Sequence, residues 1–188
     1  MGWGKEIAAS RQLIALAAVL ALGVLTASCF QPLYGNHTLA SGESVRDKLG
    51  AIDIPTIPAP NGTPESRLAV ELRNQLMYSF NGGAGAAAPT HRLQVTLSSS
   101  ITTIIVDVAS GRPETQVENI NATFTLVEIA TKKVVLSSST FAHASFDIPG
   151  TAQRFAQQRA WHDAEDRAVG LVVDNIRNRL ASYFVAGT

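Results

Sequence analysis

The sequence contains very little cysteine and little charge. Cys29 is the single cysteine among 188 residues, so no disulfide can form within the chain. Asp, Glu, Lys and Arg make up 16% of the residues, and the formal net charge is zero. The basic stripe that marks nucleic-acid binders is missing. We therefore expect a fold stabilised by its apolar core and no nucleic-acid partner.

Sequence motifs of common enzymes are missing as well. No Gly-x-Ser-x-Gly elbow occurs, and GGAGAAAP is no phosphate loop because no strand precedes it and no Lys-Ser/Thr follows. His162 and Asp166 in WHDAED are one helical turn apart. A catalytic zinc site needs three protein ligands, so His91 or His143 would have to supply the third. We predict neither catalysis nor a metal site; a periplasmic enzyme or metal-binding protein built around His162 is the alternative.

The first 28 residues have the layout of a secretory signal peptide. Lys5 and Arg11 form a basic head, and the run from Leu13 to Ser28 has no charge and ends in small residues. A transmembrane anchor is the competing interpretation, but a bilayer core needs about 20 apolar residues. The run has 16 residues, two of them polar. We predict that residues 1–28 are a lipoprotein signal peptide.

The sequence TASC, which ends at Cys29, resembles a bacterial lipobox, although its leucine, Leu25, lies four residues before the cysteine rather than the usual three. The resemblance implies a diacylglycerol and an N-acyl chain such as palmitate, bound covalently to Cys29, and we expect no other cofactor. Stable membrane attachment needs more than one acyl chain, which this modification supplies. An ordinary secreted protein with an incidental cysteine is the alternative. We predict a lipidated tether over residues 29–47 and a single domain over residues 48–188.

The first part of this domain predicts one short strand and one helix. Apolar residues alternate over 52–54 and a proline follows, which indicates an edge strand because proline cannot donate to a ladder. Thr63 is a common N-cap type, and Pro64 suits the first helical position. Leucines every four residues, continued by Phe80, give one apolar face, and the glycine pair that begins at Gly82 ends the helix.

The second part predicts three strands and a long helix. Alternating apolar residues in three segments between residues 93 and 148 indicate two successive hairpins. The alternation changes at Ile104, which indicates a bulge or a strand buried on both sides. Residues 151–184 have apolar residues, among them Leu171, at helical spacing. We expect an α+β fold, a two-layer sandwich of a four-stranded, mainly antiparallel sheet with two helices on one face, in the order β-α-β-β-β-α.

The face of the predicted sheet that points away from the helices carries short, uncharged side chains. A solvated sheet face normally carries more Lys and Glu. Hydroxyl and amide groups on short side chains can instead form hydrogen bonds to a partner surface brought close. A partner-facing sheet and an ordinary solvated sheet rich in threonine are both consistent with the pattern, which consists of Thr96, Ser98, Ser100, Asn121, Thr123 and Thr125.

Three segments together resemble the LptE family of lipopolysaccharide (LPS)-assembly lipoproteins. SCFQPLYG resembles the anchor segment of alphaproteobacterial members, LAVELRNQL the first helix, and SFDIPGT with DAEDRAVGLVVDNIRNRL the last strand and second helix. The resemblance spans most of the mature chain. It implies a non-catalytic lipoprotein anchored at the periplasmic side of the cell outer membrane. Its partners would be LPS and the outer-membrane β-barrel LptD, which it would plug and help to assemble.

The resemblance also implies basic residues that contact the phosphates of LPS. The positions nearest to the family pattern are Arg112, in the turn between the first two long strands, and Arg154, near the start of the last helix. Arg112 follows Gly111, whereas the family's arginine precedes the turn glycine. The alternative interpretation is that each of the two is an ordinary solvated surface arginine. The alternative function is that of an accessory lipoprotein of another envelope transporter. Phe30, after the cysteine, is not the aspartate that retains many lipoproteins in the inner membrane, which favours the outer membrane.

Overall fold

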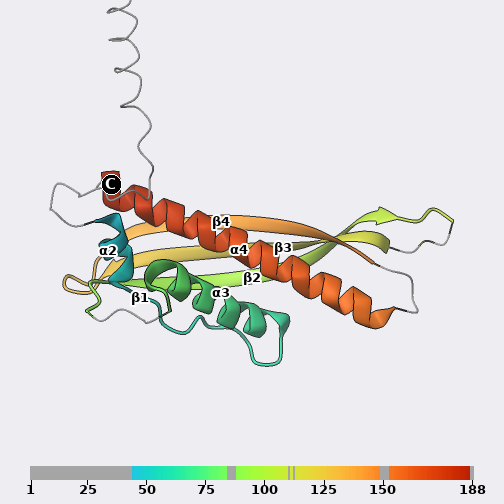
Figure 1. Cartoon of the computed structure of the whole chain (residues 1–188), viewed down its shortest axis with the longest axis horizontal. Helices are drawn as coiled ribbons and strands as arrows, with labels where there is room; N and C mark the ends of the chain where they lie inside the picture. Colours follow the sequence, from blue (N-terminus) through green and yellow to red (C-terminus); the bar gives the residue numbers. More distant parts are fainter. Residues whose placement is uncertain (1–43, 84–87, 110, 112, 149–152, 187–188) are drawn as a thin grey trace, which may run out of the picture. The chain divides into compact units, whose positions relative to one another are not determined.

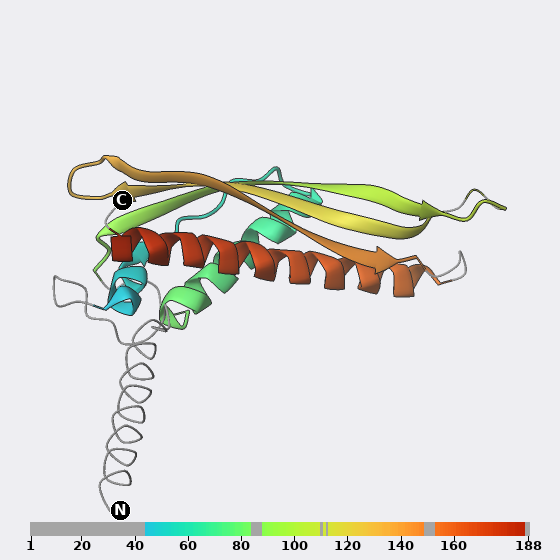
Figure 2. The same ribbon diagram turned by 90° about the horizontal axis from the view of Figure 1, so that it is seen from above.

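The computed structural model describes residues 44–83, 88–109, 111, 113–148 and 153–186. These residues form a sheet with strand order β1-β2-β3-β4, in which β1 is parallel to β2 and the other neighbours are antiparallel. Figures 1 and 2 show the helices on one face of this sheet. The predicted α+β fold is confirmed, with a mixed sheet because of the one parallel pair. The elements are α2 (Val45–Gly50), β1 (Ile52–Asp53), α3 (Pro64–Asn81), β2 (His91–Val106), β3 (Pro113–Glu128), β4 (Val134–Asp147) and α4 (Arg154–Ala186).

Helix α3 begins and ends at the predicted residues. Thr63 is the N-cap residue, but its hydroxyl donates to the carbonyl of Pro60 at 2.9 Å and does not cap the helix. At the other end Gly82 adopts a left-handed φ of 70°, and its N–H donates to the carbonyl of Tyr78. Only glycine enters this conformation without strain, so the glycine signal in the sequence was specific. The apolar residues of the helix that are buried are Leu68, Ala69, Leu72, Leu76 and Phe80.

Helix α4 is the predicted long helix, but one residue of its predicted apolar face is exposed. It begins at Arg154, and residues 149–152 lie outside the described residues. Leu171 is 50% exposed, although we predicted it on the buried face. The buried positions recur every four residues from Ala164 to Leu180, which turns the stripe towards Val169 and away from Leu171.

The core lies between the sheet and the helices. Alternate residues of the strands point towards the helices, as the sequence pattern predicted, and the opposite residues point away. Short side chains on α4 let this helix lie close to β4. The strand residues of this core that are at most 7% exposed are Ile52, Leu93, Val95, Ile120, Ala122, Phe124, Leu126, Leu136, Ala142, Ala144 and Phe146.

Helix α2 was not predicted. Residues 45–47, which we assigned to the tether, form its first turn. The Ser44 hydroxyl accepts from the backbone N–H of Asp47, and the Asp47 carboxylate accepts from the backbone N–H of Ser44, which makes a capping box. Val45 and Leu49 are buried against the core. A six-residue helix is too short to show a period in the sequence, which explains the error. Cys29 and the rest of the predicted tether lie outside the described residues.

The end of β2 contains the predicted irregularity. The β2–β3 register shifts between Thr103 and Ile105 and again between Ile105 and Val106. The alternative prediction, a strand buried on both sides, is wrong because Ile104 is 60% exposed and Val108 fully exposed. Figure 1 shows the β2–β3 turn extending past the helices, so no helix covers these side chains. We call this part, with the first turns of α4, the distal end.

Candidate functional site

The sheet face that points away from the helices carries no charged side chain over five consecutive cross-strand rows. We call these rows the outer face. The register aligns Thr96 with Thr123 and Thr123 with Ser139, and the neighbouring rows follow the same pattern. The fifteen residues include no Asp, Glu, Lys or Arg. They are Gln94, Thr96, Ser98, Ser100 and Thr102 of β2, Val117, Asn119, Asn121, Thr123 and Thr125 of β3, and Ser137, Ser139, Phe141, His143 and Ser145 of β4.

The outer face offers hydrogen-bonding groups and one aromatic pair. Asn119 donates through Nδ2 to the Ser100 carbonyl and to Thr102 Oγ1, both at 3.2 Å. Phe141 is 68% exposed, and its ring stacks on His143 with centroids 6.3 Å apart. All six polar residues singled out in the sequence lie on this face. The aromatic pair was missed, although Phe141 stands at an outward position among serines in the alternating pattern of β4.

Of the two arginines predicted to bind LPS, the structure describes one. Arg154 is the first residue of α4 and is exposed at the distal end. It lines a cleft of about 380 Å³ together with Ile101, Phe146 and Trp161 and three glutamines. Arg112 lies outside the described residues.

The distal end also exposes a group of apolar side chains. Because a monomeric protein rarely leaves several large apolar residues together in water, such a group indicates a contact surface. An apolar surface with an arginine beside it suits an amphiphile, since the guanidinium pairs with phosphate oxygens and the aliphatic groups accept hydrocarbon. The exposed residues are Ile101, Ile104, Ile105, Val106 and Val108 of the β2–β3 hairpin and Phe155 of α4, which is 86% exposed.

A buried ionic cluster joins α3, α4 and β3 at the inner side of the sheet. Glu165 of α4 is 1% exposed and forms a salt bridge with Arg67 of α3, which also contacts Asp166 at 3.3 Å. His162 Nδ1 lies 2.7 Å from Glu165 Oε2. Glu118 of β3 is equally buried. The cluster therefore supplies the polar contacts in an otherwise apolar interface.

One acid in this cluster has a shifted pKa, and burial is the main cause of the shift. Burial raises the pKa of Glu118, because the charged carboxylate loses its hydration; a hydrogen bond from Trp161 opposes this shift, and the nearby charge of Glu165 adds to it. The arrangement does not form the metal site that we kept as an alternative. His162 contacts Glu165 rather than Asp166, and no group of three His, Cys, Asp or Glu among the described residues could hold a metal ion.

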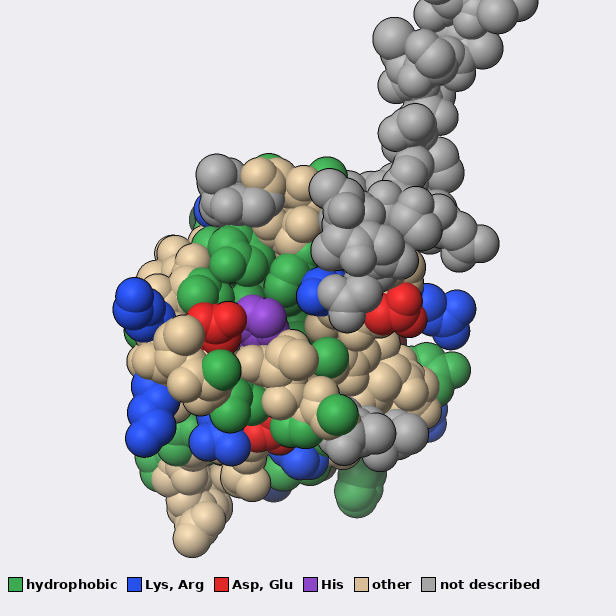
Figure 3. Space-filling view, turned by 90° about the vertical axis from the view of Figure 1, so that its left-hand side faces the viewer, with side chains coloured by type: hydrophobic (Ala, Val, Ile, Leu, Met, Phe, Trp, Pro, Cys, Tyr) green, Lys and Arg blue, Asp and Glu red, His purple; other side chains and the backbone are tan. Residues whose placement is uncertain are grey.

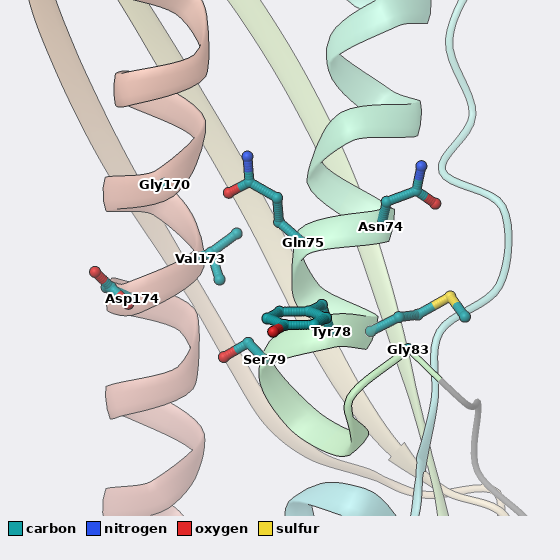
Figure 4. A pocket seen from close by; sticks show the side chains of 9 residues that line it. Asn74, Gln75, Tyr78, Ser79, Gly83, Gly170, Val173 and Asp174 are labelled. Atoms are coloured by element: carbon teal, nitrogen blue, oxygen red, sulfur yellow. The ribbon is translucent and has the colours of Figure 1, made fainter.

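A hollow of about 670 Å³ lies between α3 and α4 on the helical side. Figure 4 shows Gln75 and Tyr78 of α3 and Val173 of α4 around it. Gly170 faces Gln75, and an added Cβ there would lie 3.9 Å from the Gln75 amide oxygen. Asp174 and Tyr78 are the ionisable residues among the described ones that line the hollow, and no Lys, Arg or His lies with them in this lining.

Residues 49–180 match the family model of the LptE lipopolysaccharide-assembly family. The chain belongs to this family. The match begins within α2 and ends within α4, so it contains both the outer face and the distal end. It confirms the family that the sequence motifs indicated. No curated protein matches the chain.

One solved structure shares the fold of this LptE-family domain, and another is reported beside it. A protein from Caulobacter crescentus, described as a lipoprotein, superposes with a TM-score of 0.58 at 20% identity, covering 77% of this chain and 97% of that one. Lipoprotein B from Nitrosomonas europaea gives a TM-score of 0.47 at 13% identity, covering 72% of this chain and 84% of that one. At such low identity the first likeness shows the fold alone. Among the described residues of the chain, no helix has the length and apolarity to span a bilayer.

Proposed function

We propose that this chain is a lipid-anchored, non-catalytic component of an outer-membrane LPS-assembly complex, with its outer face against the inner wall of the LptD barrel. Membership of the LptE family supports the role. The outer face carries the proposal, because fifteen outward side chains on three strands contain no Asp, Glu, Lys or Arg.

The chemistry of the outer face fits the interior of a barrel. The inner wall of an outer-membrane barrel is polar. A charge that is buried against such a wall loses hydration and destabilises the contact unless it finds a partner. Hydroxyl and amide groups have a smaller hydration cost and can exchange hydrogen bonds with either donors or acceptors. A long uncharged face of Ser, Thr and Asn therefore suits enclosure by a polar wall.

The proposal includes a lipid anchor and a ligand. Cys29 would carry the diacylglycerol and N-acyl chains that hold the domain at the periplasmic side of the outer membrane. The distal end would bind LPS as it passes, with Arg154, and Arg112 beyond the described residues, pairing with phosphate groups. The cleft places the exposed aliphatic residue Ile101 beside Arg154, which supports this assignment because LPS carries both phosphates and acyl chains.

Affinity purification from envelope membranes tests the barrel contact. We expect the wild-type protein to retain a stoichiometric outer-membrane barrel. Thr123→Lys places one charge on the middle strand of the outer face and should abolish retention. Val70→Lys is the matched control, because Val70 is 58% exposed on α3, away from the sheet. Recovery of an inner-membrane transporter instead, or full retention by Thr123→Lys, would refute the proposed contact.

A further inference from the structure

Basic and apolar side chains gather at the end of the domain opposite the distal end. Backbone hydrogen bonds join three elements there: Thr90 N–H donates to the Ala51 carbonyl at 2.9 Å, and Ile129 N–H donates to the Thr90 carbonyl at 3.0 Å. The ring of His91 meets the edge of Phe184 with centroids 5.4 Å apart, which adds the last turns of α4. We call this surface the proximal face. It contains Arg46 and Lys48 of α2, Arg92 of β2, Lys132 and Lys133 of the β3–β4 turn, and the apolar residues Ile129, Val134, Phe184 and Val185.

The proximal face is more basic than the rest of the chain. It has five basic residues against three acids, Asp47, Asp53 and Glu128. Asp53 is paired with Arg92 at 2.9 Å, and Glu128 accepts a hydrogen bond from Thr131. The described residues include 12 basic and 13 acidic ones, so those outside this face comprise seven basic and ten acidic residues. The charge of the chain is therefore unevenly distributed, with the positive excess at this end.

Apolar side chains lie within the basic rim. Val134 is 59% exposed and Val185 52% exposed. Figure 3 views this end and shows hydrophobic side chains around a histidine, an acidic side chain beside the histidine, and Lys and Arg side chains at the margin. Burial lowers the pKa of His91, so the imidazole is neutral at neutral pH and adds no charge. An apolar centre with a basic rim is the arrangement that interfacial membrane-binding surfaces use.

The position of the predicted lipid anchor adds a geometric reason. Ser44 is the N-cap residue of α2 at this end, and Cys29 precedes it by 15 residues. A chain of this length reaches at most about 50 Å. An acylated Cys29 would therefore keep the proximal face at a high effective concentration near the lipid surface, where even a weak contact is occupied.

We propose that the proximal face docks on a bilayer surface that contains anionic phospholipid. Lys132, Lys133 and Arg46 face the lipid phosphates, while Val134 and Val185 enter the headgroup region. This inference rests on the proposed anchoring of Cys29 and is independent of the barrel. It gives the anchored domain, before it enters the barrel, a defined orientation, with the distal end pointing away from the lipid surface.

Vesicle co-sedimentation tests the inference. The probe is the chain from residue 29 onward with Cys29→Ser, which keeps the whole described core but has no acyl chains. We expect it to bind vesicles of phosphatidylcholine with phosphatidylglycerol, and not vesicles of phosphatidylcholine alone. Lys132→Gln with Lys133→Gln should weaken binding about 30-fold. Arg159→Gln with Arg167→Gln removes the same charge from exposed positions of α4 that belong neither to the proximal face nor to the cleft of Arg154, and should leave binding unchanged.

The outcomes separate lipid docking from its rivals. Val134→Ser should reduce the part of the binding that persists at high salt, because that part comes from apolar contact. No binding of the unlipidated chain to anionic vesicles overturns the inference. So does an equal loss in both arginine and lysine variants, which would report net charge alone. If the lysine variant binds vesicles normally but loses the barrel, the face contacts protein rather than lipid. Because the vesicles contain no barrel, a failure of the barrel proposal leaves this result unaffected.

Discussion

The indole Nε1 of Trp161 donates a 3.0 Å hydrogen bond to Oε2 of Glu118 and thereby ties the early turns of α4 to the middle of β3. Glu118 is 1% exposed and projects from the inner side of the sheet. Glu165, one helical turn after Trp161 on α4, forms a salt bridge with Arg67 of α3. Buried polar groups that find each other lose little, whereas any other arrangement would leave them unpaired. These bonds therefore fix how the two helices lie on the sheet. Neither helix covers the opposite face of the sheet.

Glu118→Gln should stabilise the domain in a pH-dependent way. Burial raises the pKa of Glu118 above its ordinary value of 4.5, so the folded state binds this proton more tightly than the unfolded state. Ionisation of Glu118 therefore destabilises the wild type as pH rises, and glutamine, which keeps an acceptor for Trp161, removes that loss. Denaturant titrations at a series of pH values should give a stability gap near zero below the ordinary value and a growing gap above it. A gap that does not change with pH would contradict this.

Arg67→Ala should destabilise the domain because it leaves the buried carboxylate of Glu165 without its strongest partner. We expect a loss of about 3 kcal/mol, at the low end for a broken buried pair because Arg67 is 40% exposed and His162 still contacts Glu165. Chemical denaturation measures the change in the free energy of unfolding. Asp166→Asn is the matched control, since Asp166 is 55% exposed, and it should cost less than about 1 kcal/mol.

The double variant Arg67→Met with Glu165→Met extends this test. Removing both charges avoids an unpaired buried ion, and two apolar side chains of similar size can pack in their place. The double variant should therefore be clearly more stable than Arg67→Ala. If it is equally destabilised, the loss comes from packing of the Arg67 stem and not from the charge of Glu165.

Cys29→Ala should release the folded protein into the soluble periplasmic fraction after a high-salt wash, since the predicted acyl chains supply most of the membrane affinity and salt weakens the charged contact of the proximal face. Fractionation of cells that lack the barrel, together with mass spectrometry of the mature terminus, measures this. The circular dichroism spectrum should stay unchanged because the described core lies downstream of residue 43. Retention of the variant in the membrane fraction would favour an uncleaved N-terminal helix instead.

Arg154→Ala should weaken the binding of LPS to the purified complex. A hydrogen bond to a charged group contributes about 1.5–3 kcal/mol, which corresponds to a loss of about 10- to 150-fold. Arg159→Ala provides the comparison, because Arg159 is exposed on the same helix but does not line the cleft. Phe155→Ser should add to the loss if the acyl chains lie on the apolar group. If all three variants bind LPS as tightly as the wild type does, Arg154 does not contact the ligand.

Local signals in the sequence predicted the regular elements well. Pro64 and Gly82 set the ends of α3 because their backbone preferences act within one or two residues. The alternation in β3 predicted which side chains are buried, and the change at Ile104 predicted the bulge, since both are properties of consecutive residues. The exposure of that part of β2 was not predictable, because it depends on where the helices end above the sheet.

The candidate sites also differ in whether a local sequence pattern could predict them. The uncharged outer face was visible in the sequence because a strand repeats every two residues. The ionic cluster was not, because Arg67 and Glu165 are 98 positions apart and no local pattern connects them. His162 was noticed, but we expected Asp166 as its neighbour, whereas packing of α3 against α4 gives Asp166 to Arg67.

The sequence by itself determined the identity of most elements, the alternation of the sheet, the family and the prediction of an acylated Cys29, because propensity, capping and short motifs act between near neighbours. Only the tertiary structure decided which acids are buried and paired, that residues 45–47 belong to a packed helix, and that basic and apolar groups from α2, the β3–β4 turn and α4 meet at one end. Those arrangements depend on contacts between distant segments, which form when the helices cover one face of the sheet and leave the other face and both ends exposed.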